Sequence, residues 1–339
     1  EEDGDLHIDT RFGDIIDHAP VTFYEGKKEA ELQSGFALTG KTVSFKLATY
    51  NLTQTVVIDP WQQIPTLPNS NCVWECDHDA AGNVYMIGGD MPMKLRKYNS
   101  TGTLQWTYNT PWDTVNTWLG AMATDANGNS YVTAGSSAAI QKINNAGGMT
   151  WSKTGGALDE YWTIAFNCDQ SKLIIGGTRL GVFPPAGSHG VIFDLNTSNG
   201  NVNSLQNVAS QTPGILINDI NEVRAISSSK NAKYYFLTLD TIGAISQNLN
   251  ICSTDPIFAN NSGYNFAYKS EYFRPNNGNA GICAIRANDK FCYTQNGTTV
   301  HKRSLVNGAI LGSAAIPTGI NTTTLGKNQP GNSGIDVDD

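Results

Sequence analysis

The sequence predicts an all-β protein: a β-propeller of four-stranded blades, at least five with the start of a sixth, preceded by part of a small antiparallel β domain. Three observations predict it: a repeated unit, two hairpin patterns in each unit, and a turn-rich composition. The chain has 34 glycines among 339 residues, and only 15% of its residues are charged. No window combines the apolar spacing of an amphipathic helix with helix caps.

The first hairpin of the repeat is clearest in residues 74–88 and 120–134. Each segment is an alternating apolar run, an Asp-x-x-Gly-Asn turn and a second alternating run. The Gly82-Asn83 pair recurs 46 residues later as Gly128-Asn129. Glycine supplies the positive φ that such a turn needs, and Asp and Asn bond back to its backbone. The pattern therefore predicts a β-hairpin in each unit.

A second hairpin follows the first in each unit. Residues 97–106 match residues 142–151 at a spacing of 45. Two hairpins make four strands, which is one propeller blade. Solenoid repeats of roughly 20–30 residues do not fit this period. An array of β-sandwiches is the alternative architecture.

Three later units are more degenerate. The third spans residues 162–200, the fourth runs from residue 223 with its second turn at 240–243, and the fifth spans 281–317. Residues 333–339 resemble the first strand of a sixth unit, with Asp338 where Asp79 and Asp125 stand. The predicted division is the C-terminal part of a small β domain (1–60), a proline-containing linker (61–71), blades 1–5 (72–330) and the first strand of a further blade (331–339).

Six cysteines are present, without the spacing of a zinc site. Cys283 and Cys292 flank a short turn at residues 286–289 symmetrically, so a cross-strand disulfide is geometrically possible there. The alternative is a pair of small buried hydrophobic residues. The other four cysteines allow three pairings: Cys72, Cys76, Cys168 and Cys252. This number of cysteines favours an oxidising, exported location.

Charge and hydropathy exclude two classes of partner. The formal net charge is −8, and Lys and Arg form no patch. A nucleic acid is therefore not expected as a partner. No apolar run reaches the length of a membrane span, so no membrane insertion is expected. The sequence begins within a strand-like pattern without a starting Met, and we expect it to be part of a longer chain.

The residues predict no catalytic, metal or cofactor site. The Asp-rich turns at residues 77–83 and 125–129 resemble fragments of calcium loops, but they lack the further acidic ligands and the distal Glu of an EF-hand. Turn formation explains the same residues and their recurrence. Ser188-His189 lies in a loop without a nucleophile elbow. Trp106 and Trp151 recur at one blade position, which indicates packing. Candidates for exposed aromatic contacts are Trp61, Trp112 and Trp118.

Several runs resemble a known family. Residues 13–21, 43–50 and the Ile58-Asp59-Pro60 run precede repeats with Asp-x-x-Gly-Asn-x-Tyr. Together they resemble the large secreted SBBP-type β-propeller proteins of Bacteroidota. Many members of that family end in a gliding-motility-associated or type IX secretion sorting domain, which this sequence lacks. Its later blades also lose the Gly-Asn turn. The resemblance implies an extracellular or cell-surface protein, and Thr114 and Thr241 match the Asp-Thr-apolar pattern that such bacteria O-glycosylate.

We therefore expect a secreted or cell-surface scaffold or adhesion module of a larger protein, without enzymatic activity or a cofactor. Its partners would be other surface proteins or glycans. One alternative is a propeller that binds carbohydrate or degrades polysaccharide, since propellers gather acidic residues from several blades at one end. Another is a subunit of a surface, secretion or gliding assembly.

Overall fold

The structure is a computed structural model, and all statements below concern the residues that it describes. These are residues 4–10, 13–17, 19–25, 27–40, 42–59, 65–67, 73–89, 93–112, 120–135, 137–180, 188–207, 220–228, 234–242, 246–254, 266–267, 271–273, 283–296, 299–306 and 308–315. Every regular element among them is a β-strand. No helix in these ranges offers the length and apolarity of a membrane span.

The chain divides into two compact units. Unit 1 comprises residues 1–66 with 101–103, and unit 2 comprises residues 67–100 with 104–339. The predicted linker at 61–71 is described only at residues 65–67, and the predicted strand at 331–339 lies outside the described residues.

Unit 1 consists of small antiparallel sheets. Strands β1 and β2 form a hairpin, β3 pairs with both β4 and β7, and β5 pairs with β6. The buried side chains of β3 are Thr22 and Phe23, whereas the hairpin β5–β6 leaves Leu38 and Phe45 exposed. The strands are β1 (Leu6–Thr10), β2 (Gly13–Asp17), β3 (Val21–Tyr24), β4 (Lys27–Leu32), β5 (Ser34–Thr39), β6 (Thr42–Leu47) and β7 (Val56–Asp59).

Unit 2 is a run of five antiparallel blades, four of them meanders of four strands in chain order and one, blade 4, a sheet of five strands. The all-β propeller predicted from the repeats is thereby confirmed. In blade 4 two short strands share the last position, since β23 and β24 both pair with β22.

The strands of the first two blades match the predicted hairpins closely. Blade 1 comprises β8 (Val73–His78), β9 (Val84–Gly88), β10 (Lys94–Tyr98) and β11 (Leu104–Asn109). Blade 2 comprises β12 (Met122–Thr124), β13 (Ser130–Thr133), β14 (Ala139–Ile143) and β15 (Met149–Thr154).

The other three blades are built on the same plan. Blade 3 comprises β16 (Asp159–Phe166), β17 (Lys172–Leu180), β18 (Ser188–Asn196) and β19 (Val202–Asn207). Blade 4 comprises β20 (Ile220–Ser228), β21 (Tyr234–Ile242), β22 (Ser246–Thr254), β23 (Phe266–Ala267) and β24 (Glu271–Phe273). Blade 5 comprises β25 (Cys283–Ala287), β26 (Phe291–Asn296), β27 (Thr299–Ser304) and β28 (Ile310–Ala315).

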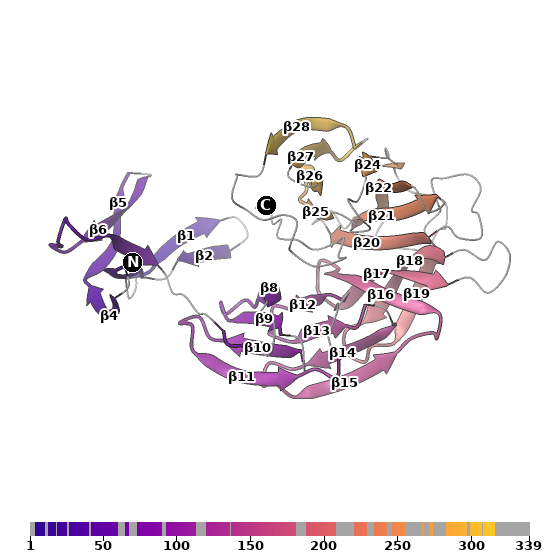
Figure 1. The fold of residues 1–339 in the computed structure, drawn as a ribbon, viewed down its shortest axis with the longest axis horizontal. Coiled ribbons are helices and arrows are strands. Elements are labelled where there is room, and N and C mark those ends of the chain that lie inside the picture. Colours follow the sequence, from indigo (N-terminus) through magenta and orange to yellow (C-terminus); the bar gives the residue numbers. More distant parts are fainter. Residues whose placement is uncertain are drawn as a thin grey trace. The chain divides into compact units, whose positions relative to one another are not determined.

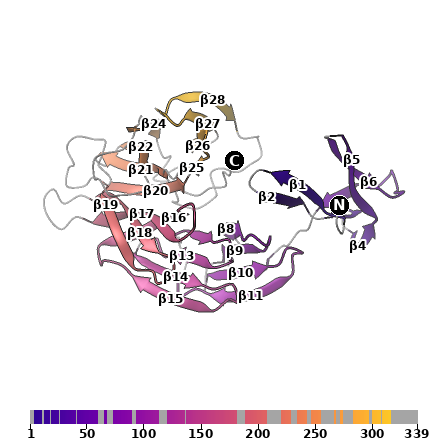
Figure 2. The same cartoon turned by 180° about the vertical axis from the view of Figure 1, so that it is seen from behind.

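We call the first strand of each blade its inner strand. In blades 1 to 4 it contacts the inner strand of the next blade. These contacts join β8 to β12, β12 to β16, β16 to β20 and β20 to β25. The remaining strands follow outward in order, which is clearest for blades 1, 2 and 5 in Figure 1 and again from behind in Figure 2. We call the last strand of each blade its outer strand.

The hydrophobic core consists of layers between successive blades. Tyr85 lies in the layer between blades 1 and 2, and Tyr131 lies in the layer between blades 2 and 3. Phe236 belongs to the layer between blades 3 and 4, and Tyr235 belongs to the layer between blades 4 and 5. Adjacent residues of a strand point to opposite faces, so Tyr235 and Phe236 contribute to different layers. Blades 2, 3 and 4 therefore bury both faces.

The same irregularity recurs in four blades. The register between the third and fourth strands shifts at Lys97/Tyr98, Lys142/Ile143, Asp194/Leu195 and Lys302/Arg303. A β-bulge at one position increases the local twist of each blade. The shared bulge also aligns the blades residue by residue.

One predicted turn was misplaced. Residues 240–242, expected at the second turn of the fourth unit, belong to strand β21, where Thr241 lies opposite Ile220 and Gln247. This unit has no Gly-Asn pair to mark its turn, so the pattern gave no local signal. The predicted O-glycosylation site Thr241 therefore has a strand backbone.

A glycine in the second hairpins of blades 2 and 3 permits close packing on the preceding blade. Gly147 has a φ of 84°, and a Cβ atom there would lie 2.8 Å from Cδ2 of Trp106. Gly200 has a φ of 70°, and a Cβ atom there would lie 2.7 Å from Cζ3 of Trp151. Both turns therefore need the left-handed backbone and the missing side chain at once.

This packing predicts that alanine substitutions at two adjacent glycines affect stability differently. Gly147→Ala should destabilise unit 2 by about 2 kcal/mol, because it combines left-handed strain with overpacking against Trp106. Gly148→Ala should change stability by less than about 0.5 kcal/mol, since a Cβ atom there meets its nearest neighbour at 3.4 Å. Chemical denaturation of both variants measures the difference. Equal midpoints would contradict the packing argument.

Candidate functional site: the contacts between blades

The Asp-x-x-Gly-Asn turns are closed by their own aspartates. Oδ1 of Asp79 accepts hydrogen bonds from the N–H groups of Ala81 (3.0 Å) and Asn83 (2.9 Å), while Oδ2 accepts one from the Tyr85 hydroxyl (2.9 Å). Asp125 makes equivalent bonds within its own turn. Both carboxylates are therefore occupied by backbone and tyrosine donors, as the turn interpretation predicts.

Next to this turn, blade 1 holds the second turn of blade 2. The indole N–H of Trp106 donates to the backbone oxygen of Asn145 (2.9 Å), and the ammonium of Lys97 donates to the Asn145 side chain. The Tyr85 hydroxyl lies 3.3 Å from the same side-chain oxygen. We call Tyr85, Lys97 and Trp106 the clamp of blade 1.

Blade 2 carries the same clamp, made of Tyr131, Lys142 and Trp151. The backbone oxygen of Thr197 in blade 3 accepts from Lys142 Nζ (3.1 Å) and from the Trp151 indole (3.3 Å). The Lys142 ammonium also lies 5.1 Å from the centre of the Tyr131 ring, and Lys97 lies 5.4 Å from that of Tyr85. Two consecutive junctions therefore use the same donors at equivalent positions.

Burial shifts the pKa values of the clamp residues. Burial and the neighbouring aspartate raise the pKa values of both clamp tyrosines, Tyr85 and Tyr131, far above their ordinary value. Burial lowers the pKa of Lys142, and the negative charge of Asp125 partly opposes this. Burial acts against ionised Asp79, but bonds from Asn83, Tyr85 and Ala81 lower its pKa overall. The tyrosines remain protonated donors at any physiological pH.

Blade 3 departs from the clamp. The bulge alignment places Ile174, Asp194 and Ser204 where blade 2 has Tyr131, Lys142 and Trp151. Asp194 instead forms an ion pair with Lys172 of its own blade, at 2.8 Å. The junction from blade 3 to blade 4 is mainly apolar and includes Ile174, Ile192 and Val223.

A second contact joins the inner strands. Asp77 Oδ2 accepts a hydrogen bond from the Thr124 N–H (2.6 Å), and Glu75 accepts one from the Met122 N–H. Three blades later, the Ser227 hydroxyl accepts from the Ala287 N–H (3.0 Å). The register shows that Asp77 and Ser227 occupy equivalent positions, opposite Tyr85 and Tyr235. An acceptor at this position thus binds an N–H on the free edge of the next sheet.

Asp77 is the most electrostatically unusual of these acceptors. Burial raises its pKa above the ordinary 3.8, although N–H bonds from Thr124 and His78 and the positive charges of His78 and Arg286 act in the opposite direction. Its other oxygen accepts from the His78 N–H (2.8 Å). Arg286 lies on the inner strand of blade 5, so its charge reaches an acidic group of blade 1.

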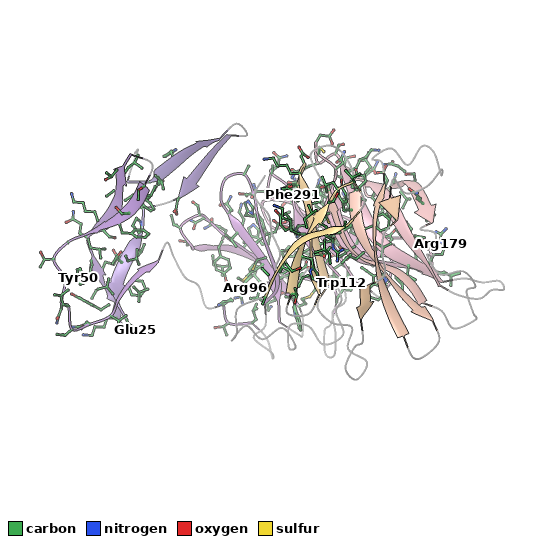
Figure 3. The ribbon with its side chains drawn as sticks, turned by 90° about the horizontal axis from the view of Figure 1, so that it is seen from above. Glu25, Tyr50, Arg96, Trp112, Arg179 and Phe291 are labelled. Atoms are coloured by element: carbon green, nitrogen blue, oxygen red, sulfur yellow. The ribbon has the colours of Figure 1, made fainter. Side chains whose placement is uncertain are left out.

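The buried carboxylates of the described chain all have structural partners. Asp79 and Asp125 close turns, and Asp194 pairs with Lys172. Asp159 binds Arg179, which is labelled in Figure 3, through two bonds of 2.6 and 2.9 Å. In the described ranges no three His, Cys, Asp or Glu side chains are grouped so as to hold a metal ion. These four carboxylates therefore stabilise the turns and sheets of their own blades.

The predicted aromatic contacts have mixed outcomes. Trp112 is half-buried and packs against the layer between blades 1 and 2, so it is not a freely exposed contact residue. Its carbonyl oxygen accepts from Thr110 (3.3 Å). Trp61, Trp118 and the predicted glycosylation site Thr114 lie outside the described residues.

The predicted pairing of Cys283 with Cys292 was wrong in register. Asn288 Oδ1 accepts the N–H groups of Lys290 (3.0 Å) and Phe291 (2.8 Å), which fixes the turn two residues later than expected. Cys292 therefore lies opposite Ala287, and Cys283 lies opposite Asn296. Four residues along a strand is roughly 13 Å, too far for a disulfide. Cys292 is a free, buried thiol whose pKa burial raises to about 12.

The sequence interpretation missed the clamp lysines and the inner-strand acceptors. Lys97 and Lys142 stand at equivalent places in the matched second hairpins, and this recurrence was a usable signal. Asp77 and Ser227 differ in residue type, so the sequence carries no signal that they are equivalent. Only the strand register shows it.

One family model matches the first part of the chain. A domain of unknown function, DUF7948, matches residues 1–61. No curated protein matches the chain.

Solved structures match this chain at low sequence identity. A protein of unknown function from Bacteroides caccae is 15% identical, with a TM-score of 0.43 over 69% of this chain and 72% of that one. The Pan2 WD40 domain from Neurospora crassa is 10% identical, with a TM-score of 0.47 over 72% and 66%. BamB from Moraxella catarrhalis is 9% identical, with a TM-score of 0.41 over 88% and 91%.

The inner-strand contact predicts a pH-dependent effect of Asp77. A carboxyl whose pKa is higher in the folded state costs stability when it ionises, as the pH rises from 3.8 through the higher folded pKa. Asp77→Asn keeps an oxygen for the Thr124 N–H and removes this charge. It should therefore be more stable than the wild type at pH 7, and the gain should vanish near pH 3.

Two further variants make the test specific. Asp77→Ala should cost about 1–3 kcal/mol at either pH, because it leaves a buried N–H without its acceptor. Ser227→Ala removes the equivalent acceptor in blade 4 and should act independently of pH. Urea denaturation at both pH values measures all of them, and a stability gain of Asp77→Asn that persists at pH 3 would refute the electrostatic account.

Proposed function

We propose that this protein is a scaffold of the bacterial cell surface, secreted as part of a larger protein, which holds other proteins on the outer strands of its blades. The propeller supplies a rigid support, because each blade is bound to the next through a packed layer. In this proposal the polar contacts that recur between blades serve assembly, and the partner binds at the periphery.

One observation carries the proposal. Four outer strands begin with a large apolar side chain that stays exposed: Leu104 is 46% exposed, Met149 52%, Val202 47% and Ile310 48%. Each lies opposite the residue that follows the bulge, so the four positions are equivalent. We call these four residues the outer rim.

The recurrence of the outer rim supports a binding role. Single exposed apolar residues are ordinary in proteins. The outer-rim position is apolar and exposed even in blade 3, where the clamp residues are replaced. Partner binding at this position explains that recurrence better than chance does. Apolar side chains at regular intervals suit a protein partner, since apolar contact area drives most protein association.

The expected location supports a surface scaffold as well. The resemblance to secreted SBBP-type propeller proteins implies an exported protein, and the acidic chain offers no basic patch for nucleic acid. A carbohydrate-binding or polysaccharide-degrading propeller remains the competing proposal, and its activity is measured in the same experiment.

The outer rim predicts the behaviour of a double variant. Leu104→Ser with Met149→Ser should lower adhesion of cells of the producing bacterium to a surface coated with the protein by about tenfold, because two apolar contacts are lost. The control is Leu158→Ser with Val306→Ser, which changes two residues that are 40% and 83% exposed outside the outer rim. It should leave adhesion unchanged.

Two outcomes would overturn the scaffold proposal. The first is equal adhesion of the rim variant and the wild type. The second is depolymerisation of a polysaccharide by the purified protein in a glycan turnover assay, which would favour the degrading propeller. Glycan-array binding without turnover, unaffected by the rim variant, would indicate a carbohydrate-binding module.

A further inference from the structure

The outer strands of four blades are almost free of charge. They are β11, β15, β19 and β28, and each is six residues long. Lys153 of β15 is the one charged side chain among them, although 15% of the residues of the chain are charged. We call these four strands the neutral band. Blade 4 is not part of it, because two short strands share its last position and one of them contains Glu271.

Charge and exposure are related here in the reverse of the ordinary way. Charged side chains usually lie where a protein is most exposed. In blades 1 and 2 the outer strands are mainly exposed, whereas the third strands are buried or half-buried. All six residues of β28 are exposed. Yet the third strands of the same four blades carry the charges, at Lys94, Arg96, Lys97, Lys142, Asp194, Lys302 and Arg303.

Packing within the chain accounts for only part of this composition. The half-buried residues of β11 are Trp106 and Tyr108, and that of β15 is Trp151. At the other positions of these two strands the side chains are exposed, and a Lys or Glu there would change stability little. Outer strands of sheets often carry such charges, which prevent pairing with other chains. Apart from Lys153, the neutral band lacks this protection.

A surface without charge is suited to contact with another protein. The core of a protein interface is depleted in charged residues, because a charge that is buried without a partner loses its hydration. The outer rim supplies an exposed apolar side chain at the start of each of these strands. The neutral band extends that surface along the strands, which in blades 1 and 2 follow the outer side of the propeller (Figure 1).

The same surface indicates the chemistry of the partner. A charged partner would be met by complementary charges, and Lys153 alone offers one. A sugar ring would stack on an exposed aromatic side chain. However, the indoles of Trp106 and Trp151 donate to the next blade, and the Tyr108 hydroxyl donates to Gln141 (3.0 Å). The exposed apolar residues of the outer rim are all aliphatic, which favours a protein.

We propose that the neutral band binds an uncharged, apolar surface of a partner protein, so that the scaffold holds its partner without ion pairs. This inference rests on the proposed scaffold function and names the chemistry of its partner. The turns that precede β15 and β19 are held by the clamps of blades 1 and 2, through Asn145 and Thr197. The surface is therefore preorganised, which lowers the entropic cost of binding.

Ionic strength and chemical treatment of the cells test the partner's chemistry. The assay is adhesion of cells of the producing bacterium to a surface coated with the protein. Adhesion should change less than about twofold between about 0.05 and 0.5 M NaCl, because salt screens ion pairs and not apolar contacts. Protease treatment of the cells should lower adhesion about tenfold or more, since it removes the partner. Periodate oxidation of their glycans should leave it unchanged.

Charges placed on the neutral band test the surface itself. Thr107 and Ser152 are exposed and follow the clamp tryptophans of blades 1 and 2. Thr107→Glu with Ser152→Glu should adhere about tenfold less than Thr107→Gln with Ser152→Gln, because the two pairs have the same shape and differ in charge. Ala81→Glu with Asn127→Glu adds the same charge to exposed first turns of the same blades. This control should adhere like the wild type.

The outcomes separate this inference from the scaffold proposal. A tenfold fall of wild-type adhesion with salt, loss of adhesion after periodate but not after protease, or equal adhesion of the Glu and Gln pairs would each overturn the inference. Each leaves the scaffold proposal standing if the outer-rim variant still loses adhesion. If the outer-rim variant adheres like the wild type, the scaffold proposal fails and this inference fails with it. Equal denaturation midpoints of the Glu and Gln pairs show that a difference in adhesion is not misfolding.

Discussion

Each blade of unit 2 is a sheet with two apolar faces, and neither face is buried until a neighbouring blade packs against it. The core is accordingly a series of layers, and alternate residues of one strand serve different layers, as Tyr235 and Phe236 do. Burial of apolar area supplies most of the stability of such an array, but it does not by itself set the height or angle of one blade on the next. Polar contacts add that information in blade 1, which has both the clamp and the inner-strand contact, and in blades 2 and 4, which have one of them each.

The clamp and the inner-strand contact act at different distances from the inner edge. The clamp holds the second turn of the next blade, and Asp77 or Ser227 holds the N–H edge of its inner strand. Two separated contacts define an orientation that a single apolar layer leaves free. Blade 3 shows that the clamp can be lost when the apolar layer is extensive, since Ile174 replaces the clamp tyrosine there and packs against blade 4.

Local features of this fold were predictable, whereas contacts between distant residues were not. The turn at Asp79 depends on residues 79–83 alone, and its Gly-Asn pair predicts it from the sequence. The bond between Lys97 and Asn145 joins residues 48 apart and leaves no spacing signal. Two register errors arose: Asn288 sets the turn two residues later than a symmetric Cys283–Cys292 pair requires, and Thr241, in a unit without a Gly-Asn pair, fell within a strand. Trp112 was misjudged because burial depends on the neighbouring blade.

The clamp binds a main-chain oxygen in both blades that have it. Asn145 and Thr197 differ in side chain, yet each receives the indole N–H of the preceding blade through its carbonyl group. Because the tryptophan donates to a main-chain oxygen, which every residue has, the residue that accepts this bond can be substituted without loss of the bond. Duplication, loss or exchange of a whole blade therefore preserves the join, provided that the donor blade keeps its tryptophan and the receiving turn keeps its glycine. A series of such blades could therefore change its number of blades in evolution more readily than the structure of each blade.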